Sequence, residues 1–354
     1  MALRTYTYLE SPLDISGSYH IVTGGKGGIG KSFVARMLSE VILYGLSSGD
    51  IQPTIELRFD EDQEDHNDKG QLRFFDIDPE NHTFQSTFRG RALRADVFLS
   101  DENRELDERK LGTYFFPPEF PVRPRETRVY DIGSNFFDPM IDYFVQSSAL
   151  LAWQEDHRPL LFHLPLCGYQ YFRESLQSVI KILYKTNREA QLMFWINDYL
   201  PTRETDDGPS IQTYILEEQK YWATKRSEVS SVEELEQSIV SLDELYEKIS
   251  RDDFEAFTKD DLHAIYYYLT MASGQGRRLV VLVNSQKKSY KSTRNSLTEA
   301  LSKKVLFTEF IQKPDFPRPD RMMLETFFFA GKDAVFNQVM KALQGFFEDF
   351  ARNG

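Results

Sequence analysis

The sequence predicts an α/β fold, with a doubly wound and mainly parallel β-sheet carrying a helical insertion. Three observations favour this class. Short apolar runs without polar alternation recur along the 354 residues, as in strands buried on both faces. Plausible helices precede the later runs, and a glycine-rich turn joins the first run to the first helical pattern.

The expected elements follow in chain order. The run "YHIVTGG" is predicted to be the first strand, and residues 31–45 the helix after it. Two further strands are expected at "QLRFFDID" and "TRVYDIG". Three later runs complete the predicted sheet, namely "RPLLFHLPL", "AQLMFWIND" and "RRLVVLVNS".

Residues 1–354 are expected to form a single domain with two additions. An acidic loop is predicted over residues 48–71, between the first helix and the second strand. A polar, helix-prone insertion is predicted over residues 209–273, either as a lid or as an ordinary two-helix excursion. Its apolar positions at helical spacing are Leu235, Ile239, Leu242 and Leu245.

The net charge of −13 is concentrated in two segments. Residues 48–71 and 227–262 together contribute −15, which leaves the remainder at +2, so solvated loops or helix faces explain the acidity most simply. The single cysteine, Cys167, excludes an internal disulfide and a thiolate metal cluster within one chain. Without a signal peptide or an apolar run of roughly 18 residues, the protein is expected to be cytoplasmic.

A phosphate-binding loop is predicted between the first strand and the first helix. The stretch "GKGGIGKS" fits G-x-x-x-x-G-K-[ST] in the context that this motif requires. Backbone N–H groups and the helix N-terminus would cradle phosphates, Lys31 would reach the β and γ phosphates, and Ser32 would ligate Mg²⁺. The predicted nucleotide-binding residues of this loop are Gly25, Lys26, Gly27, Gly28, Ile29, Gly30, Lys31, Ser32 and Phe33.

Lys26 is not required by the general motif. The segment "KGGIGKS" resembles the deviant Walker A box of MinD and ParA ATPases, in which a signature lysine contacts nucleotide held by the other subunit. "FFDIDPENHTF" resembles the switch motif of that class, and "VYDIGSN" resembles its Walker B strand. The resemblance implies a P-loop NTPase fold, ATP and Mg²⁺ as cofactors, and a nucleotide-dependent homodimer with Lys26 and Lys31 as catalytic residues.

Three carboxylates and one glycine complete the predicted site. The resemblance assigns Asp78 to the attacking water and Asp76 to the magnesium side. Asp131 would hold a water of the magnesium shell, and Gly133 would let the next turn pass close to the γ-phosphate.

A closer resemblance extends over most of the chain. "DIGSNFFDPMIDYF", "LLFHLPLCGYQYFRESLQ" and "LMFWINDYLPTRETDDG" are similar to plasmid-borne TraL-like and StbB-like members of the class, which serve conjugation and plasmid stability. The resemblance places Asn197 against the nucleotide base, with Asn284 as the rival candidate.

The function implied is a Mg-ATP-dependent dimeric switch that hydrolyses ATP slowly in plasmid partition, plasmid stability or conjugative transfer. One alternative is an ATP-dependent synthetase or amidoligase of the CobQ or dethiobiotin synthetase type. Another is a scaffold that nucleotide stabilises without turnover. The partner protein of such a switch cannot be named from sequence.

DNA and membrane are the other partners considered. A basic excess that could meet DNA phosphates, or could line a solvated helix, comprises Arg277, Arg278, Lys287, Lys288, Lys291, Arg294, Lys303 and Lys304. An apolar helical stripe over residues 335–350 lacks cationic flanks, so docking on the core is favoured over membrane binding.

Overall fold

The computed structural model describes the chain in segments. The described residues are 15, 17–51, 55–57, 70–78, 82–88, 92–95, 97, 107–115, 126–150, 159–168, 171–186, 190–196, 209–229, 231–251, 257–270 and 278–281. The predictions for Asn197, Asn284, the apolar stripe and all of the basic segment except Arg278 lie outside these residues.

The described strands form one sheet in which every neighbouring pair is parallel. The strand order is β2-β3-β5-β1-β6-β7-β8, and β4 pairs with β3. The doubly wound α/β class is therefore confirmed. The strands are β1 (Tyr19–Val22), β2 (Ile55–Leu57), β3 (Gly70–Ile77), β4 (Ala92–Arg94), β5 (Glu126–Ile132), β6 (Leu160–Leu166), β7 (Gln191–Ile196) and β8 (Arg278–Val281).

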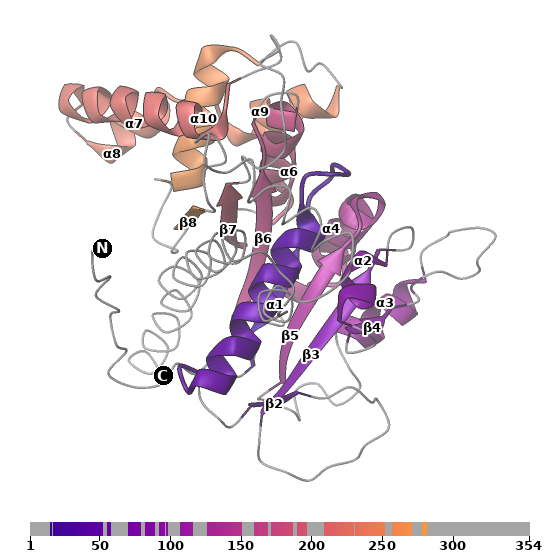
Figure 1. Cartoon of the computed structure of the whole chain (residues 1–354). Coiled ribbons are helices and arrows are strands. Elements are labelled where there is room, and N and C mark those ends of the chain that lie inside the picture. The colour runs from indigo at the N-terminus through magenta and orange to yellow at the C-terminus, as the bar shows by residue number, and fades with distance from the viewer. Residues whose placement is uncertain are drawn as a thin grey trace, which may run out of the picture.

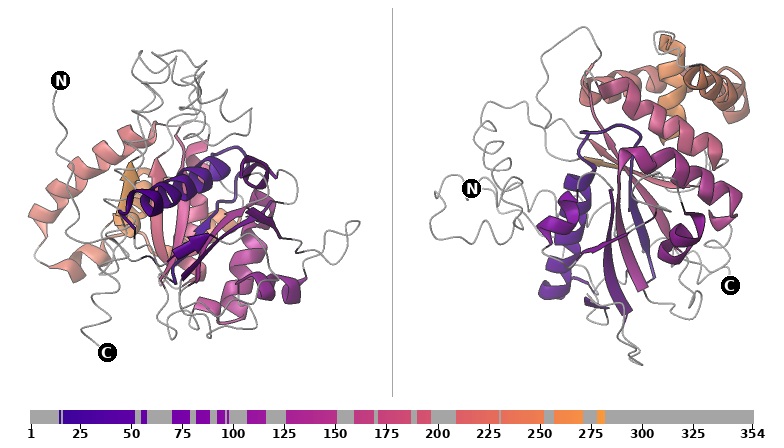
Figure 2. Two further views of the ribbon diagram at one scale, coloured as in Figure 1. Left: turned by 60° about the horizontal axis from the view of Figure 1, so that its bottom comes forward. Right: turned by 90° about the vertical axis from the view of Figure 1, so that its right-hand side faces the viewer.

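Helices cover both faces of the sheet. In Figure 2, α1 lies on one face, and α4 and α6 lie on the other. Figure 1 shows α7 to α10 gathered beyond the end of the sheet where α6 begins. The helices are α1 (Lys31–Ser48), α2 (Thr83–Thr87), α3 (Glu108–Phe115), the 3-10 turn η1 (Ser134–Phe136), α4 (Phe137–Gln146), α6 (Phe172–Lys185), α7 (Ile211–Glu228), α8 (Val232–Gln237), α9 (Leu242–Ser250) and α10 (Lys259–Thr270).

The central strands are buried on both faces because helices cover both faces of the sheet. Every residue of β1, β5 and β6 is buried. Tyr19 and Ile21 belong to the main apolar cluster, which also contains Phe144 of α4 and Leu176 of α6. His20 points to the opposite face because successive strand residues alternate. This pattern explains why continuous apolar runs predicted the parallel sheet.

β1 lies at the point where the chain reverses its direction of travel across the sheet. The chain leaves β1 for β2, β3 and β4, returns to pair β5 with one side of β1, and then crosses to β6 on the other side. In open parallel sheets, ligands bind beyond the carboxyl ends of the strands at such a switch point. The loop after β1 occupies that place.

Two sequence expectations need correction. The acidic segment 48–71 is more than a loop, because Ile55–Leu57 pairs with β3 as an edge strand. The helical spacing from Leu235 to Leu245 spans two helices, since α8 ends at Gln237 and α9 begins at Leu242. Ser241 separates them through a capping box with Glu244, which satisfies the first N–H groups of α9.

Candidate functional site

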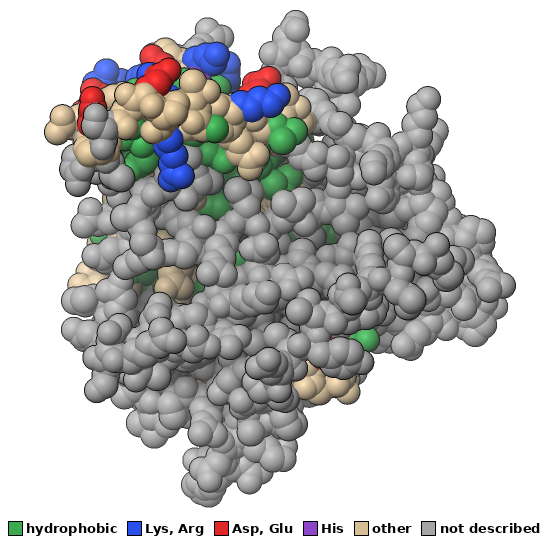
Figure 3. Space-filling view, turned by 90° about the vertical axis from the view of Figure 1, so that its left-hand side faces the viewer, with side chains coloured by type: hydrophobic (Ala, Val, Ile, Leu, Met, Phe, Trp, Pro, Cys, Tyr) green, Lys and Arg blue, Asp and Glu red, His purple; other side chains and the backbone are tan. Residues whose placement is uncertain are grey.

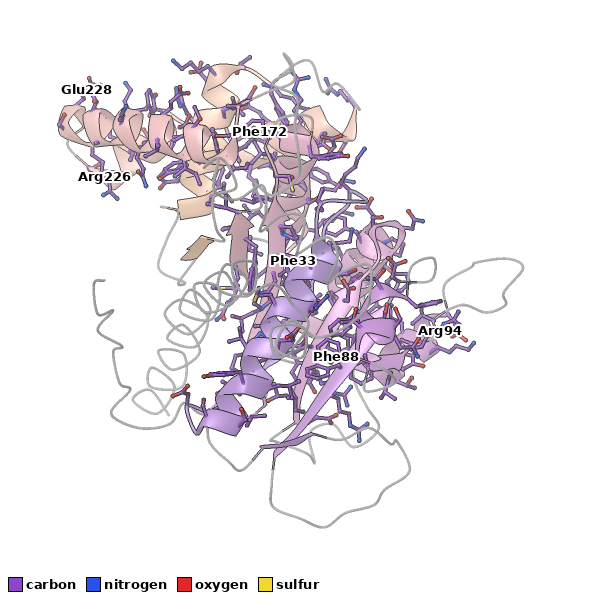
Figure 4. The ribbon with its side chains drawn as sticks, in the orientation of Figure 1. Phe33, Phe88, Arg94, Phe172, Arg226 and Glu228 are labelled. Carbon is purple, nitrogen blue, oxygen red and sulfur yellow. The ribbon has the colours of Figure 1, made fainter. Side chains whose placement is uncertain are left out.

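The loop between β1 and α1 has the backbone that its glycines predict. Gly28 and Gly30 are left-handed, with φ of 79° and 98°, a conformation that L side chains rarely adopt. The N-cap residue of α1 is Gly30, so the helix begins without a side-chain cap from that position. In Figure 4, Phe33 is labelled at the upper end of α1, below Phe172 at the start of α6. The geometry suits an anion at the helix N-terminus.

Lys31 is folded back over this loop. Its Nζ donates a hydrogen bond to the backbone oxygen of Lys26 at 2.8 Å, and the residue is only 7% exposed. Burial lowers the pKa of the Lys31 ammonium, and the carboxylates of Asp131 and Asp78 act in the opposite direction. The ammonium is thus a nearly buried cation within the loop, facing two acidic groups.

Asp131 lies beside the loop because β5 pairs with β1, which aligns Asp131 with Val22. Burial raises the pKa of its carboxyl to about 7, and the neighbouring Asp76 adds to that effect. The Ser32 side chain hydrogen-bonds to this carboxylate. Among the described residues, the buried Oδ2 atom has no hydrogen-bond partner.

An unpaired carboxylate oxygen in the interior is costly unless a cation or a donor reaches it. The oxygen atoms of Asp131 and Ser32 are of the hard type that Mg²⁺ prefers. These residues therefore fit the predicted magnesium site. Within the described part of the chain, no group of three His, Cys, Asp or Glu side chains is arranged to hold a metal by protein ligands alone.

Asp76 supports the turn after β3. Its carboxylate accepts hydrogen bonds from the backbone N–H of Asp78 at 3.1 Å and of Gln85, in α2, at 2.8 Å. Burial raises its pKa, whereas the two N–H donors act to lower it. Both oxygens are thus engaged with the backbone, and the predicted role of Asp76 toward magnesium stays a prediction.

Gly133 allows Asp78 to approach the end of β5. A Cβ atom on Gly133 would lie 3.1 Å from Cα, Cγ and Oδ1 of Asp78. Any larger residue would therefore displace Asp78 or the turn that follows β5. A Cβ atom on Gly27 would lie 3.6 Å from the Ser134 hydroxyl, which places this turn against the loop.

Lys26 lies at the exposed rim of the loop and points to the start of α6. Its Nζ is 3.4 Å from Oε1 of Glu174 and 5.9 Å from the centre of the Tyr171 ring. The side chains of Lys26 and Glu174 are 42% and 34% exposed. The structure thus separates the two lysines, with Lys31 inside the loop and Lys26 at its rim.

Sequence reasoning missed the residues that hold the loop from the far side. The Ser178 hydroxyl accepts a hydrogen bond from the Gly25 N–H at 2.9 Å, and the Cys167 thiol donates to the Ile29 oxygen at 3.2 Å. The Ser175 hydroxyl accepts from the Cys167 N–H at 3.0 Å. The partners of the first two contacts are 153 and 138 residues apart, and no local pattern in the sequence marks such pairs.

Comparison with known proteins gives one distant relative to report. The chain is 24% identical to Protein TraL of Escherichia coli over 214 residues, which cover 60% of this chain and 74% of that protein. No protein-family model matches the chain, and no solved structure matches it. The predicted similarity to TraL-like proteins is thus confirmed as a distant one.

Among the helices that the structure describes, none is long and apolar enough to cross a bilayer.

Proposed function

We propose that this protein is a Mg-ATP-dependent switch that dimerises in the ATP state, hydrolyses ATP slowly and serves conjugative transfer or plasmid stability. The observation that carries the proposal is the buried, unpaired Oδ2 of Asp131 beside Ser32 and the glycine loop. The glycine loop and this unpaired carboxylate oxygen lie together at the switch point of the sheet.

The residues around the loop would divide the work of holding nucleotide. The N-terminus of α1 and the Lys31 ammonium would bind the phosphates, with Lys31 leaving the backbone oxygen of Lys26 to do so. Ser32 and Asp131 would hold Mg²⁺. When bound, Mg²⁺ would neutralise phosphate charge and orient the terminal phosphate.

Asp78 is the residue that we assign to orienting the attacking water. Its carboxylate contributes to the electrostatics of Lys31, and it packs on Gly133 at the turn after β5. A carboxylate next to the phosphate loop can align a water molecule without forming a covalent intermediate. Hydrolysis that depends on positioning alone is expected to be slow.

The dimer and the cellular process rest on different support. In this proposal Lys31 holds the phosphates within the subunit, and Lys26 is not needed for that role. The exposed position of Lys26 at the rim of the loop suits contact with nucleotide in a second subunit. The distant relative TraL supports the assignment to plasmid transfer.

Lys31→Ala tests the phosphate loop. Removing the buried ammonium should lower Mg-ATP affinity roughly 10- to 100-fold, as for other hydrogen bonds to charged groups. Isothermal titration calorimetry measures this affinity, and Lys220→Ala, on the exposed side of α7, is the matched control. Unchanged affinity in the Lys31 variant would contradict the assignment.

The wild-type protein tests the switch itself. Sedimentation velocity should show a dimer with Mg-ATP and a monomer with Mg-ADP, with phosphate release at steady state. Nucleotide retained at one per chain without turnover would support the scaffold alternative instead.

A further inference from the structure

Lys26 makes two contacts within its own subunit, one through its backbone and one through its side chain. The backbone oxygen of Lys26 accepts a hydrogen bond from Lys31, while the Lys26 ammonium pairs with Glu174 and lies over the Tyr171 ring. Lys26 is therefore held at both ends by its own chain. Its backbone is tied to the phosphate-binding lysine, and its side chain is tied to the N-terminal end of α6.

The same end of α6 also fixes the loop backbone. Ser178 accepts a hydrogen bond from the Gly25 N–H and donates one to the backbone oxygen of Glu174. The loop and Glu174 are thus connected through a single hydroxyl. This connection keeps the Glu174 carboxylate within reach of Lys26 and gives the ion pair a fixed location.

We propose that Glu174, with Tyr171, is a competitor within the subunit for the Lys26 ammonium and so sets the threshold for ATP-dependent dimerisation. This inference rests on the proposed function, because it assumes that Lys26 acts on nucleotide in the partner subunit. A phosphate of the partner that approaches the ammonium would be repelled by the Glu174 carboxylate, so the two anions compete for the same cation. Each subunit must therefore break its own contact before the dimer forms.

The terminal phosphate of ATP can draw Lys26 away from Glu174 because the ion pair between these two side chains is weak. Exposed ion pairs contribute little in water, so breaking one should weaken association only roughly threefold. In a two-fold symmetric dimer two such contacts break, and the factors multiply to roughly tenfold. A triphosphate attracts the ammonium more strongly than a diphosphate, since the interaction scales with charge.

Phosphate binding in one subunit also loosens Lys26. When Lys31 turns to the phosphates, it leaves the backbone oxygen of Lys26. The remaining restraint on that residue is the contact with α6. Nucleotide binding and release of the Lys26 side chain are thereby linked through the loop backbone.

The test compares Glu174→Gln with Arg173→Gln, an exposed neighbour in the same turn of α6. Sedimentation velocity with Mg-ATP, on the Asp78→Ala background, gives the dimer dissociation constant, and calorimetry gives the ATP affinity of the monomer. Glu174→Gln should lower the dimer dissociation constant roughly tenfold, while Arg173→Gln leaves it unchanged. Monomer affinity for ATP should stay within about twofold in both variants.

A double-mutant cycle separates this idea from a structural effect. On a Lys26→Ala background, Glu174→Gln should no longer change the dimer dissociation constant, because the ammonium for which it competes is gone. An equal effect with and without Lys26 would overturn the competition. If the parent dimerises with ATP and Glu174→Gln does not tighten it, the inference is wrong and the proposed function stands. If neither protein dimerises with ATP, both fail.

Discussion

At the scale of the residue, Asp131 links stability to the proposed cation site. Its pKa is raised from 3.8 to about 7 by burial, so between those values the folded state keeps a proton that the unfolded chain has released. Ionisation of Asp131 therefore lowers the free energy of unfolding as pH rises through this window, and the penalty is fully present above pH 7. A site that binds a cation would carry such a cost in its free state.

Asp131→Asn should be more stable than the wild type at pH 8 in magnesium-free buffer, by roughly 1 to 3 kcal/mol, because the buried charge is gone. Urea unfolding at pH 8 and pH 5 measures this, and the gain should shrink at pH 5. Glu217→Gln, which changes an exposed carboxylate of α7, is the control. The variant should also lose stabilisation by Mg-ATP, and a loss of stability at pH 8 would contradict a penalty from buried charge.

Gly133→Ala tests the position of Asp78. The backbone φ of −59° suits alanine, so the only cost is the contact of the new Cβ with Asp78 at 3.1 Å. Displacing a water-orienting carboxylate should slow turnover roughly tenfold or more, while the phosphate loop still binds ATP. Steady-state phosphate release and calorimetry measure the two effects.

The matched control is Gly112→Ala in α3. Of the residues that the structure describes, the new Cβ there would meet the Tyr143 hydroxyl, at 3.2 Å. If both alanine variants slowed turnover equally, general loss of packing would be the better explanation.

At the residue scale, the sequence predicted what lies inside the motifs and missed what supports them. The turn that holds the left-handed Gly28 and Gly30 could be predicted because the motif G-x-x-x-x-G-K-[ST] requires glycine there. Asp131 is assigned through the resemblance of "VYDIGSN" to a Walker B strand, and its role toward magnesium stays a prediction. Ser178 and Glu174 could not be predicted, since an ordinary amphipathic helix carries such residues without any consequence. The contacts of Lys26 depend on the packing of α6, which no local pattern specifies.

At the scale of the element, a line of buried hydrogen bonds crosses β1, β6 and β7. Trp195 Nε1 donates to Nδ1 of His163 at 2.9 Å, and the opposite nitrogen of His163 lies 3.0 Å from Nδ1 of His20. Nε2 of His20 is 3.0 Å from the Ser18 hydroxyl, which donates to the Ile15 oxygen. The indole N–H can only donate, so with both imidazole rings neutral His163 donates to His20, and His20 donates to the Ser18 hydroxyl.

This line predicts acid sensitivity. Burial lowers the pKa of His20 to about 3 and that of His163 well below its ordinary value of 6.5. Below pH 6.5 the unfolded chain takes up protons that the folded chain does not, so stability is present above that pH and falls as pH falls toward 3. Well below pH 6.5, His20 should remove roughly 1.4 kcal/mol per pH unit down to about pH 3, and His163 should act in the same direction.

Urea unfolding between pH 6.5 and 5 measures that slope, and His20→Gln should reduce it by about half, since one of two titrating rings is removed. A slope that does not change in the variant would assign the acid sensitivity to other groups.

Long, buried helices and strands could be predicted from the sequence, and short ones could not. Strands of four or more residues with covered faces produced apolar runs, whereas β2 and β4, with three residues each, left no periodic signal. The break between α8 and α9 follows from Ser241, whose side chain caps the N-terminus of α9. The spacing of apolar residues gives no sign of such a cap.

At the scale of the whole molecule, the fold class followed from a few buried runs because parallel strands must be covered on both faces. The distribution of charge is also a property of the whole chain. Figure 3 shows acidic and basic side chains interspersed over α7 and its neighbours, as on a solvated surface. Relation to TraL covers part of the chain, so the cellular role is inferred from likeness and the chemistry from the site.

The parallel topology also sets the order of events during biosynthesis. The glycine loop is translated early, but the hydroxyl that holds its first N–H lies 153 residues later. At about 5 to 20 residues per second, the ribosome needs about 8 to 30 s to span that interval. Until α6 leaves the exit tunnel, the nascent chain has the motif without its support. The loop therefore gains this hydrogen bond only after the strands around β1 and helix α6 have assembled.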